Sequence, residues 1–260
     1  MSRISLQMYT MREFTKTKED LKNTVEKLSK IGFKNLQYSV PDFISAREVK
    51  EIFDDYGIKN DSIFCPALKI EEKINDIFEQ SEIFGTKYLR VDSIPRDIVS
   101  PAGFKMYAHY LNELGELLAP MEIKILYHFH SFEFITFEKE TGMDIFLKET
   151  NPETVYIQPD TYWLIAGGNN PPDYLIKHKD RIHYVHVKDY AIGIREQLLE
   201  STPSRFAAVG TGNLDWKKII EACESFHNEM YVIEQDNCYG KDPFECVATS
   251  FKNLNKFGIY

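Results

Sequence analysis

The stretches IGFKNLQY (residues 31–38), YGIKNDSIF (56–64) and FGTKYLRV (84–91) repeat one arrangement along the first third of the chain. In each, the last residue of a helical pattern is followed by glycine, one further residue, lysine and a short apolar run. A glycine at this point can end a helix in a left-handed conformation. A fourth copy, PMEIKILYH (120–128), lacks the glycine. The repeat predicts helices that alternate with parallel strands.

Eight strands of this kind fit into the 260 residues. We expect them at residues 4–8, 35–37, 60–64, 88–91, 123–128, 155–158, 182–186 and 231–234, with helices that include 105–118, 214–226 and 243–257. Eight units match the roughly 250 residues typical of a (β/α)8 TIM barrel. The alternative is a doubly wound open sheet, but its G-x-G-x-x-G turn does not follow the first strand. The prediction is an α/β protein with a single TIM-barrel domain over residues 1–260.

Composition and charge narrow the classes of partner. Hydrophobic residues make up 43% and charged residues 27% of the chain, as in ordinary folded proteins. No apolar run approaches the roughly 20 residues that cross a bilayer, and polar residues interrupt any signal-peptide core at the start. The net charge of −9 argues against nucleic acid as the main partner. We expect a cytoplasmic protein with reduced thiols that binds a small molecule, with a homo-oligomer as one option.

Polar side chains gather where the late strands end, and this end of a TIM barrel carries the function. Glu133, Asp160, His186 and Glu234 follow or end four successive predicted strands. One such residue alone is usually a helix cap or an ion-pair partner. Three carboxylates and one imidazole held together would repel one another without a cation. Such a ligand set suits Mn²⁺, Mg²⁺, Co²⁺ or Zn²⁺. His128 is the weaker candidate, because an imidazole on a strand is often a core residue.

Several longer motifs point to a known family. They are LQMYTMR (6–12), ILYHFHSFEF (125–134), QPDTYWLIAGGNNP (158–171), RIHYVHVKD (181–189), VGTGNLDW (209–216) and IEQD (233–236). Together they resemble the sugar phosphate isomerase/epimerase family of xylose-isomerase-like barrels over essentially the whole chain. The resemblance puts the family's metal ligands on the same four positions named above. Phe129, Gln37 and Asn170 depart from the Asn, Glu and Asp that are usual in the family.

The resemblance also implies a chemistry, that of a metal-dependent sugar or sugar phosphate isomerase or epimerase. One divalent ion, Mn²⁺ in the first place, would stabilise a cis-enediolate, while Glu133 and Glu234 remove and return the proton. His130, Lys188 and Trp163 are the candidates for substrate contacts. The alternative for Lys188 is an ion pair with Asp189 or Asp160, and for Trp163 it is packing between helix and barrel.

Other functions fit the same barrel. The main alternative is a lyase that dehydrates a keto-inositol (inosose), since it too removes a proton beside a carbonyl. A metal-dependent nuclease for abasic DNA would call for more histidines and a basic groove. A binding barrel without catalysis is the third. The loop 210–213 either offers backbone N–H groups to a substrate phosphate or forms a tight turn.

Overall fold

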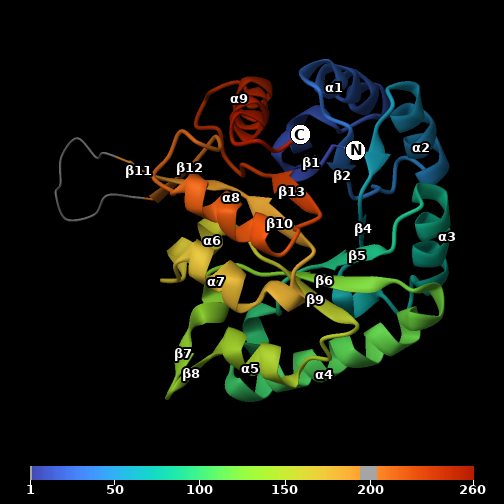
Figure 1. Cartoon of the computed structure of the whole chain (residues 1–260). Helices are drawn as coiled ribbons and strands as arrows, with labels where there is room; N and C mark the ends of the chain where they lie inside the picture. Colours follow the sequence, from blue (N-terminus) through green and yellow to red (C-terminus); the bar gives the residue numbers. More distant parts are fainter. Residues whose placement is uncertain (1, 194–203) are drawn as a thin grey trace.

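The computed structural model describes residues 2–193 and 204–260, and these form an α/β barrel with helices on its outside (Figure 1). One run of hydrogen-bonded strands has the order β10-β13-β1-β2-β3, and a second has the order β4-β5-β6-β9. Parallel bridges from Ile157 to Ile182 and from Asp160 to His186 connect β9 to β10. Because β3 and β4 follow one another along a single stretch of chain, the ring is closed and the predicted TIM barrel is confirmed.

The barrel strands lie close to the predicted positions. Their bounds are β1 Ile4–Gln7, β2 Asn35–Gln37, β3 Lys59–Asn60, β4 Ile63–Phe64, β5 Tyr88–Val91, β6 Lys124–His128, β9 Val155–Gln158, β10 Tyr184–Val187 and β13 Met230–Ile233. Two short antiparallel hairpins are added to them, β7 Thr136–Phe137 with β8 Glu140–Thr141 and β11 Asp189–Ile192 with β12 Ser204–Ala207.

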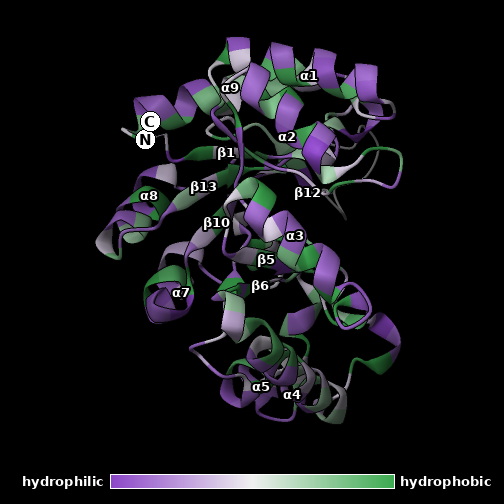
Figure 2. Cartoon of the chain, turned by 90° about the vertical axis from the view of Figure 1, so that its right-hand side faces the viewer, coloured by the Kyte–Doolittle hydropathy of each residue, from purple (hydrophilic) through white to green (hydrophobic). Residues whose placement is uncertain are grey.

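The helices cover the outside of this ring. Their bounds are α1 Lys18–Ile31, α2 Ala46–Asp55, α3 Ile74–Phe84, α4 Pro101–Leu118, α5 Gly142–Glu149, α6 Thr161–Ala166, α7 Pro171–Lys177, α8 Trp216–Ser225 and α9 Pro243–Lys256. Figure 2 shows their hydrophilic sides turned away from the barrel, as the helical spacing of apolar residues requires. No described helix combines the length and the apolar character that a membrane span needs.

The glycines of the repeated motif end helices as predicted. Gly57 and Gly85 have φ of 65°, and Gly32 has φ of 122°. The Gly32 N–H donates to the carbonyls of Leu28 and Ser29 in the last turn of α1. Only glycine takes up such φ angles at little cost, so the motif fixes where three helices stop and where the next strands begin.

The third predicted strand, residues 60–64, is divided by an interruption. The Asn60 amide bonds to the backbone of Tyr38 in both directions, at 2.9 and 3.2 Å. The next residue, Asp61, is buried and accepts hydrogen bonds from the hydroxyls of Ser5 and Ser62. The Asp61 N–H still donates to the Leu36 carbonyl at 3.0 Å, but the Asp61 carbonyl accepts from the hydroxyls of Thr86 and Tyr184, and the strand is divided here into β3 and β4.

One layer inside the barrel is apolar, and it lies towards the N-terminal ends of the strands. Leu126, Tyr184 and Val232 pack there with Tyr88, Tyr156 and Met230. This layer fills the barrel from below, as is usual for the fold. Polar side chains therefore meet above it, where the strands end.

Candidate metal centre and adjoining pocket

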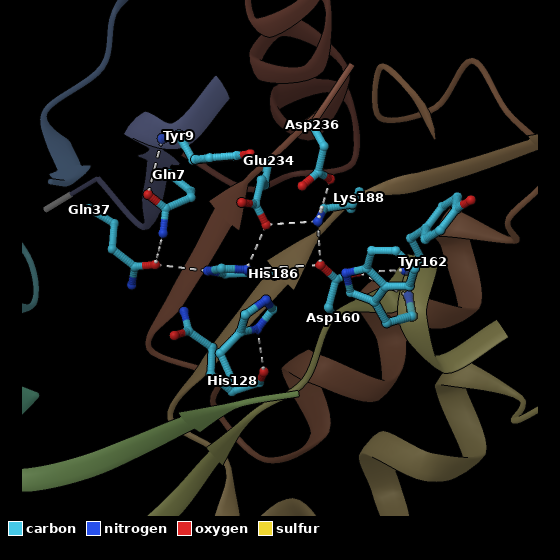
Figure 3. A network of polar contacts seen from close by, with 12 residues as sticks. Gln7, Tyr9, Gln37, His128, Asp160, Tyr162, His186, Lys188, Glu234 and Asp236 are labelled. Atoms are coloured by element: carbon cyan, nitrogen blue, oxygen red, sulfur yellow. Dashed lines mark hydrogen bonds and ion pairs between the residues drawn. The ribbon is translucent and has the colours of Figure 1, made fainter. Parts of the chain in front are cut away.

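Four buried side chains meet at the C-terminal ends of four neighbouring strands. They are His128 at the end of β6, Asp160 after β9, His186 in β10 and Glu234 after β13. Each offers one ligand atom, and these atoms lie within 4.8 Å of one another. We call this set the four-residue group. Figure 3 shows His186 between Gln37 on one side and the carboxylates on the other.

The hydrogen bonds of His186 decide which of its nitrogens faces the group. Its Nε2 lies 2.8 Å from Gln37 Oε1, an atom that only accepts hydrogen bonds. The Gln7 amide donates to the same oxygen at 3.0 Å and so fixes the orientation of the Gln37 amide. Nε2 therefore carries the proton. Nδ1 then presents a lone pair 3.0 Å from Glu234 Oε2, as expected of a metal-binding histidine with an outer partner.

His128 is held in a similar way on the other side. Its Nδ1 lies 3.3 Å from the carbonyl oxygen of Gln158, which leaves the second ring nitrogen without a proton. Burial, reinforced by the nearby His186 ring, lowers the pKa of His128 well below its ordinary value. Burial also lowers the pKa of His186. Both rings are therefore neutral at pH 7, which is the form that binds metals.

Lys188 is buried beside the group and contacts three carboxylates. Its Nζ lies 2.9 Å from Asp160 Oδ2, 2.8 Å from Glu234 Oε2 and 2.7 Å from Asp236 Oδ2. Burial opposes the charge of Lys188, but the three carboxylates outweigh it and raise the lysine pKa. Three carboxylates against one ammonium leave two negative charges, which a single divalent ion would neutralise.

The two carboxylates of the group differ in proton affinity. Burial raises the pKa of Asp160 to about 7. Burial also acts on Glu234, but the Lys188 ammonium outweighs it and holds the Glu234 pKa well below its usual value. Asp160 uses Oδ1 to cap α6, by accepting the backbone N–H groups of Tyr162 and Trp163 at 2.9 and 3.1 Å. Capping therefore accounts for one of its oxygens only.

The remaining atoms fit a divalent ion. Apart from contacts with charged neighbours, Asp160 Oδ2, His186 Nδ1 and Glu234 Oε2 are buried without a hydrogen-bond partner of ordinary geometry. Buried polar atoms are rarely left in this state. Two carboxylates and two neutral imidazoles are ligands that Mn²⁺, Zn²⁺ and related ions accept.

Glu133, which was predicted as a ligand and acid/base, lies apart from the four-residue group. It sits in the short 3-10 turn Phe132–Phe134, which follows β6 and turns its carboxylate back into the protein. Oε1 accepts from the Tyr127 hydroxyl at 2.9 Å and Oε2 from the His130 backbone N–H at 3.0 Å. Its side chain is fully buried, and burial raises its pKa to about 7. The structure brings His128 into the place that the sequence assigned to Glu133.

The three predicted substrate contacts occupy different positions. His130 faces an open pocket beside the group, and burial lowers the pKa of its ring to about 4. Trp163 lies behind it, with ring centroids 5.1 Å apart, and its indole covers the Lys188 ammonium at 5.4 Å. Lys188 pairs with Asp160, one of the two predicted alternatives, and not with Asp189.

The loop 210–213 donates its backbone hydrogen bonds to a carboxylate of the protein, that of Asp189. The backbone N–H groups of Gly210 and Gly212 donate to Asp189 Oδ2 at 2.9 and 2.8 Å, and the Trp216 indole donates to the same oxygen at 2.8 Å. These N–H groups are therefore occupied by Asp189, and of the two alternatives for this loop the structure agrees with the tight turn. A substrate phosphate is not accommodated here.

A pocket of about 460 Å³ opens next to the four-residue group. His128 and Glu234 form part of its wall. The other acidic, basic or imidazole side chains that line it are Arg12, Arg90, Asp92, His130 and Asp236. We call it the rim pocket.

Comparison with known proteins assigns this barrel to a protein family. Residues 25–237 match the family described as a xylose isomerase-like TIM barrel. The chain belongs to this family. The matched range includes the whole four-residue group, so each of its members lies within the family's own region.

Individual relatives of this xylose isomerase-like barrel differ in their named activities. An inosose dehydratase of Geobacillus thermodenitrificans is 33% identical over 146 residues, which are 52% of this chain and 48% of that protein. The chain thus spans about half the length of the curated relatives it matches first. A sugar phosphate isomerase/epimerase of Parabacteroides distasonis has a similar fold, with a TM-score of 0.79, 22% identity and coverage of 97% and 93%. The IolI protein, solved with a bound zinc atom, gives a TM-score of 0.75 at 16% identity, with coverage of 100% and 99%.

Two features of this barrel's centre were missed from the sequence. His128 was ranked as the weaker candidate, and Gln37 was noted only as a departure from the family. A signal existed for His128: it ends a predicted strand, and Gln158 ends the next predicted strand two residues before Asp160. The partner of Gln37 is 149 residues away in the chain, and no local pattern predicts such a contact.

Proposed function

We propose that this protein is a metal-dependent lyase that removes water from a keto-polyol of the keto-inositol class. The observation that carries the proposal is the position of the two glutamates. Glu234 lines the rim pocket, whereas Glu133 is buried in the core. Isomerisation or epimerisation by paired glutamates needs both at the substrate, but elimination of water can proceed with one. The inosose dehydratase relative supports the same choice.

His128, Asp160, His186 and Glu234 would hold the divalent ion. Bound there, the ion would act as a Lewis acid that acidifies the C–H beside the substrate carbonyl. The two imidazoles supply neutral ligands, and Gln37 holds the His186 ring in place. Lys188 keeps Asp160 close to the group and lowers the proton affinity of Glu234.

Glu234 is the candidate base. Its low pKa keeps the carboxylate ionised at neutral pH, and the rim pocket gives it access to a substrate. It would take the proton from the carbon beside the carbonyl. The same proton could then pass to the hydroxyl on the next carbon, which leaves as water while the C–C double bond forms. One carboxylate on one face of the substrate thus balances the whole elimination. His130, neutral and facing the pocket, is placed to hydrogen-bond the leaving hydroxyl.

Epimerisation or isomerisation of a sugar is the second candidate. It is favoured by Asp236, which provides another carboxylate in the rim pocket. The similar fold of a protein named sugar phosphate isomerase/epimerase agrees with it. In this case Glu234 and Asp236 would exchange the proton, in place of the predicted pair Glu133 and Glu234.

The decisive experiment incubates the Mn²⁺-loaded protein with a keto-inositol in D₂O and follows the products by NMR and mass spectrometry. A lyase gives deuterium exchange beside the carbonyl and a product that has lost one water. An epimerase gives exchange and a new stereoisomer of unchanged formula. The absence of exchange with keto-inositols and with ketoses would contradict both candidates.

Two variants assign the base in that experiment. Glu234→Gln should slow exchange by about 10²–10⁴-fold, the usual contribution of a general base. Glu133→Gln serves as the matched control and should exchange at nearly the wild-type rate. If Glu234→Gln keeps the metal and the wild-type rate, the base is another residue.

A further inference from the structure

The rim pocket contains a guanidinium that lacks a carboxylate partner. Arg90 is the inward-facing residue of β5, the strand next to β6 with His128. Among the described residues it forms one hydrogen bond, from Nη2 to the Ser39 hydroxyl, and this bond is long, at 3.3 Å. Its Nε is buried with no partner in that part of the chain. Within residues 2–193 and 204–260, no carboxylate forms an ion pair with Arg90. This is unusual, because buried charges are normally paired.

The carboxylates that share the pocket are already engaged elsewhere. Asp92 Oδ1 accepts the backbone N–H of Ala67 at 2.9 Å. Glu234 and Asp236 contact the Lys188 ammonium at 2.8 and 2.7 Å. Glu234, Asp61 and Asp92 act on Arg90 from a distance, and burial still lowers its pKa to about 10. Its positive charge is therefore only partly compensated.

The guanidinium is also held in a fixed orientation. Its Cζ lies 4.5 Å from the centroid of the Phe64 ring, on the neighbouring strand β4. Stacking on an aromatic ring fixes the plane of the fork without using its N–H groups. A planar fork with free donors matches the two oxygens of a carboxylate. A neutral polyol would not compensate the positive charge of the Arg90 guanidinium.

We infer that the substrate carries a carboxylate, which Arg90 binds while the keto-polyol part faces the four-residue group. The inference rests on the proposed function and narrows its substrate class to keto-polyol acids. Arg12, which also lines the pocket, gives its donors to the carbonyls of Tyr9 and Asp236. It therefore adds positive potential to the pocket, while Arg90 supplies the free donors.

The test uses D-glucuronate and D-glucuronamide, which differ only in carboxylate against amide. Binding of each to the Mn²⁺-loaded protein is measured by calorimetry, with inorganic phosphate as a third ligand. We expect glucuronate to bind about tenfold more tightly or better, as a charge-assisted hydrogen bond allows. In Arg90→Gln the two ligands should bind alike, and Arg90→Lys should restore only part of the preference.

Arg96→Gln is the matched control. Arg96 lies over the Phe132 ring, 5.3 Å from its centroid, and is not among the residues that line the rim pocket, so this variant should keep the full preference. A wild-type protein that binds both sugars equally overturns the inference, and so does a preference that survives in Arg90→Gln, since the metal would then be its source. Phosphate bound more tightly than glucuronate would overturn the choice of a carboxylate. If Arg90→Gln fails to fold, the wild-type ratio and Arg90→Lys still decide.

The proposed function fails separately, in the deuterium exchange experiment. A protein that dehydrates a neutral keto-inositol but shows no carboxylate preference would keep the proposed function and lose this inference. A protein that prefers glucuronate but exchanges no proton on any keto-polyol would lose the proposed function.

Discussion

Two fully buried carboxylates, Asp160 after β9 and Asp189 at the start of β11, have surroundings that differ completely. Asp189 Oδ2 accepts three N–H donors at 2.8–2.9 Å from the loop 210–213 and Trp216. Asp160 Oδ2 faces Lys188 and the ring of His186, with no N–H donor of the backbone. The first carboxylate is saturated by the protein. The second is left available for a cation.

The same contrast separates the two glutamates. Glu133 has a hydrogen-bond donor on each oxygen. Glu234 has its Oε2 between His186 Nδ1 and Lys188 Nζ and lies at the pocket wall. A buried acid that the protein saturates with neutral donors therefore acts structurally in this barrel, and one that meets only charged or metal-binding groups belongs to the site.

Asp160→Ala is expected to have the largest effect, because it removes a ligand and one of the three carboxylates around Lys188. Mn²⁺ affinity, measured by calorimetric titration, should fall by more than the roughly 10–100-fold that loss of an outer partner causes. Asp180→Ala removes an exposed acid of the turn Lys179–Arg181 and serves as the control. Wild-type affinity in Asp160→Ala would show that the site is wrongly assigned.

Asp189→Ala should instead affect stability. Its loss leaves several buried N–H donors without an acceptor, so the free energy of unfolding should fall by about 3 kcal/mol or more. Urea denaturation measures this, and Mn²⁺ affinity should remain close to wild type. Asp215→Ala, which removes an exposed helix cap of α8, should cost about 1 kcal/mol. If Asp189→Ala lost Mn²⁺ affinity but kept its stability, Asp189 would belong to the metal site and its structural assignment would be wrong.

Gln37→Leu tests the outer partner of His186. Without the acceptor for Nε2–H the ring is free to change tautomer or orientation, and Mn²⁺ affinity should fall by about 10–100-fold. Gln37→Glu restores an acceptor at the same place and should recover most of the affinity. Equal affinities in wild type and Gln37→Leu would mean that packing alone orients the ring.

Glu133→Gln should have the smallest effect, confined to the pH dependence of stability. Because burial raises the Glu133 pKa to about 7, the folded protein binds this proton more tightly than the unfolded chain. Its contribution to stability is therefore lost as the pH rises from about 4.5 to about 7. The variant should lose this part of the pH dependence in urea unfolding curves. An unchanged pH profile would contradict the buried position of the acid.

The sequence predicts the barrel well, because its strands and helix ends depend on local features. Glycine after a helix and a short apolar run before a polar residue suffice to locate most strands. The break between β3 and β4 could not be predicted, since the Asp61 carbonyl accepts from the hydroxyls of Thr86 and Tyr184, which are 25 and 123 residues away in the chain.

Part of the candidate site could also be predicted, because some of its residues depend on local features of the chain. Asp160, His186 and Glu234 lie at strand ends, where the direction of the side chain follows from the strand. Glu133 comes five residues after β6 ends, and there the turn Phe132–Phe134 decides its direction. Alternation along β10 puts His186 and Lys188 on one face and Asp189 on the other, so the partners of Lys188 were within reach of the sequence.

The most direct test of this account compares Mn²⁺ titrations of His128→Ala and Glu133→Gln with that of the wild type. Both variants change a buried side chain near the end of β6, but only His128 belongs to the four-residue group. We expect His128→Ala to weaken Mn²⁺ binding by more than a factor of about ten, while Glu133→Gln binds the ion as the wild type does. Loss of Mn²⁺ in Glu133→Gln together with full binding in His128→Ala would contradict it.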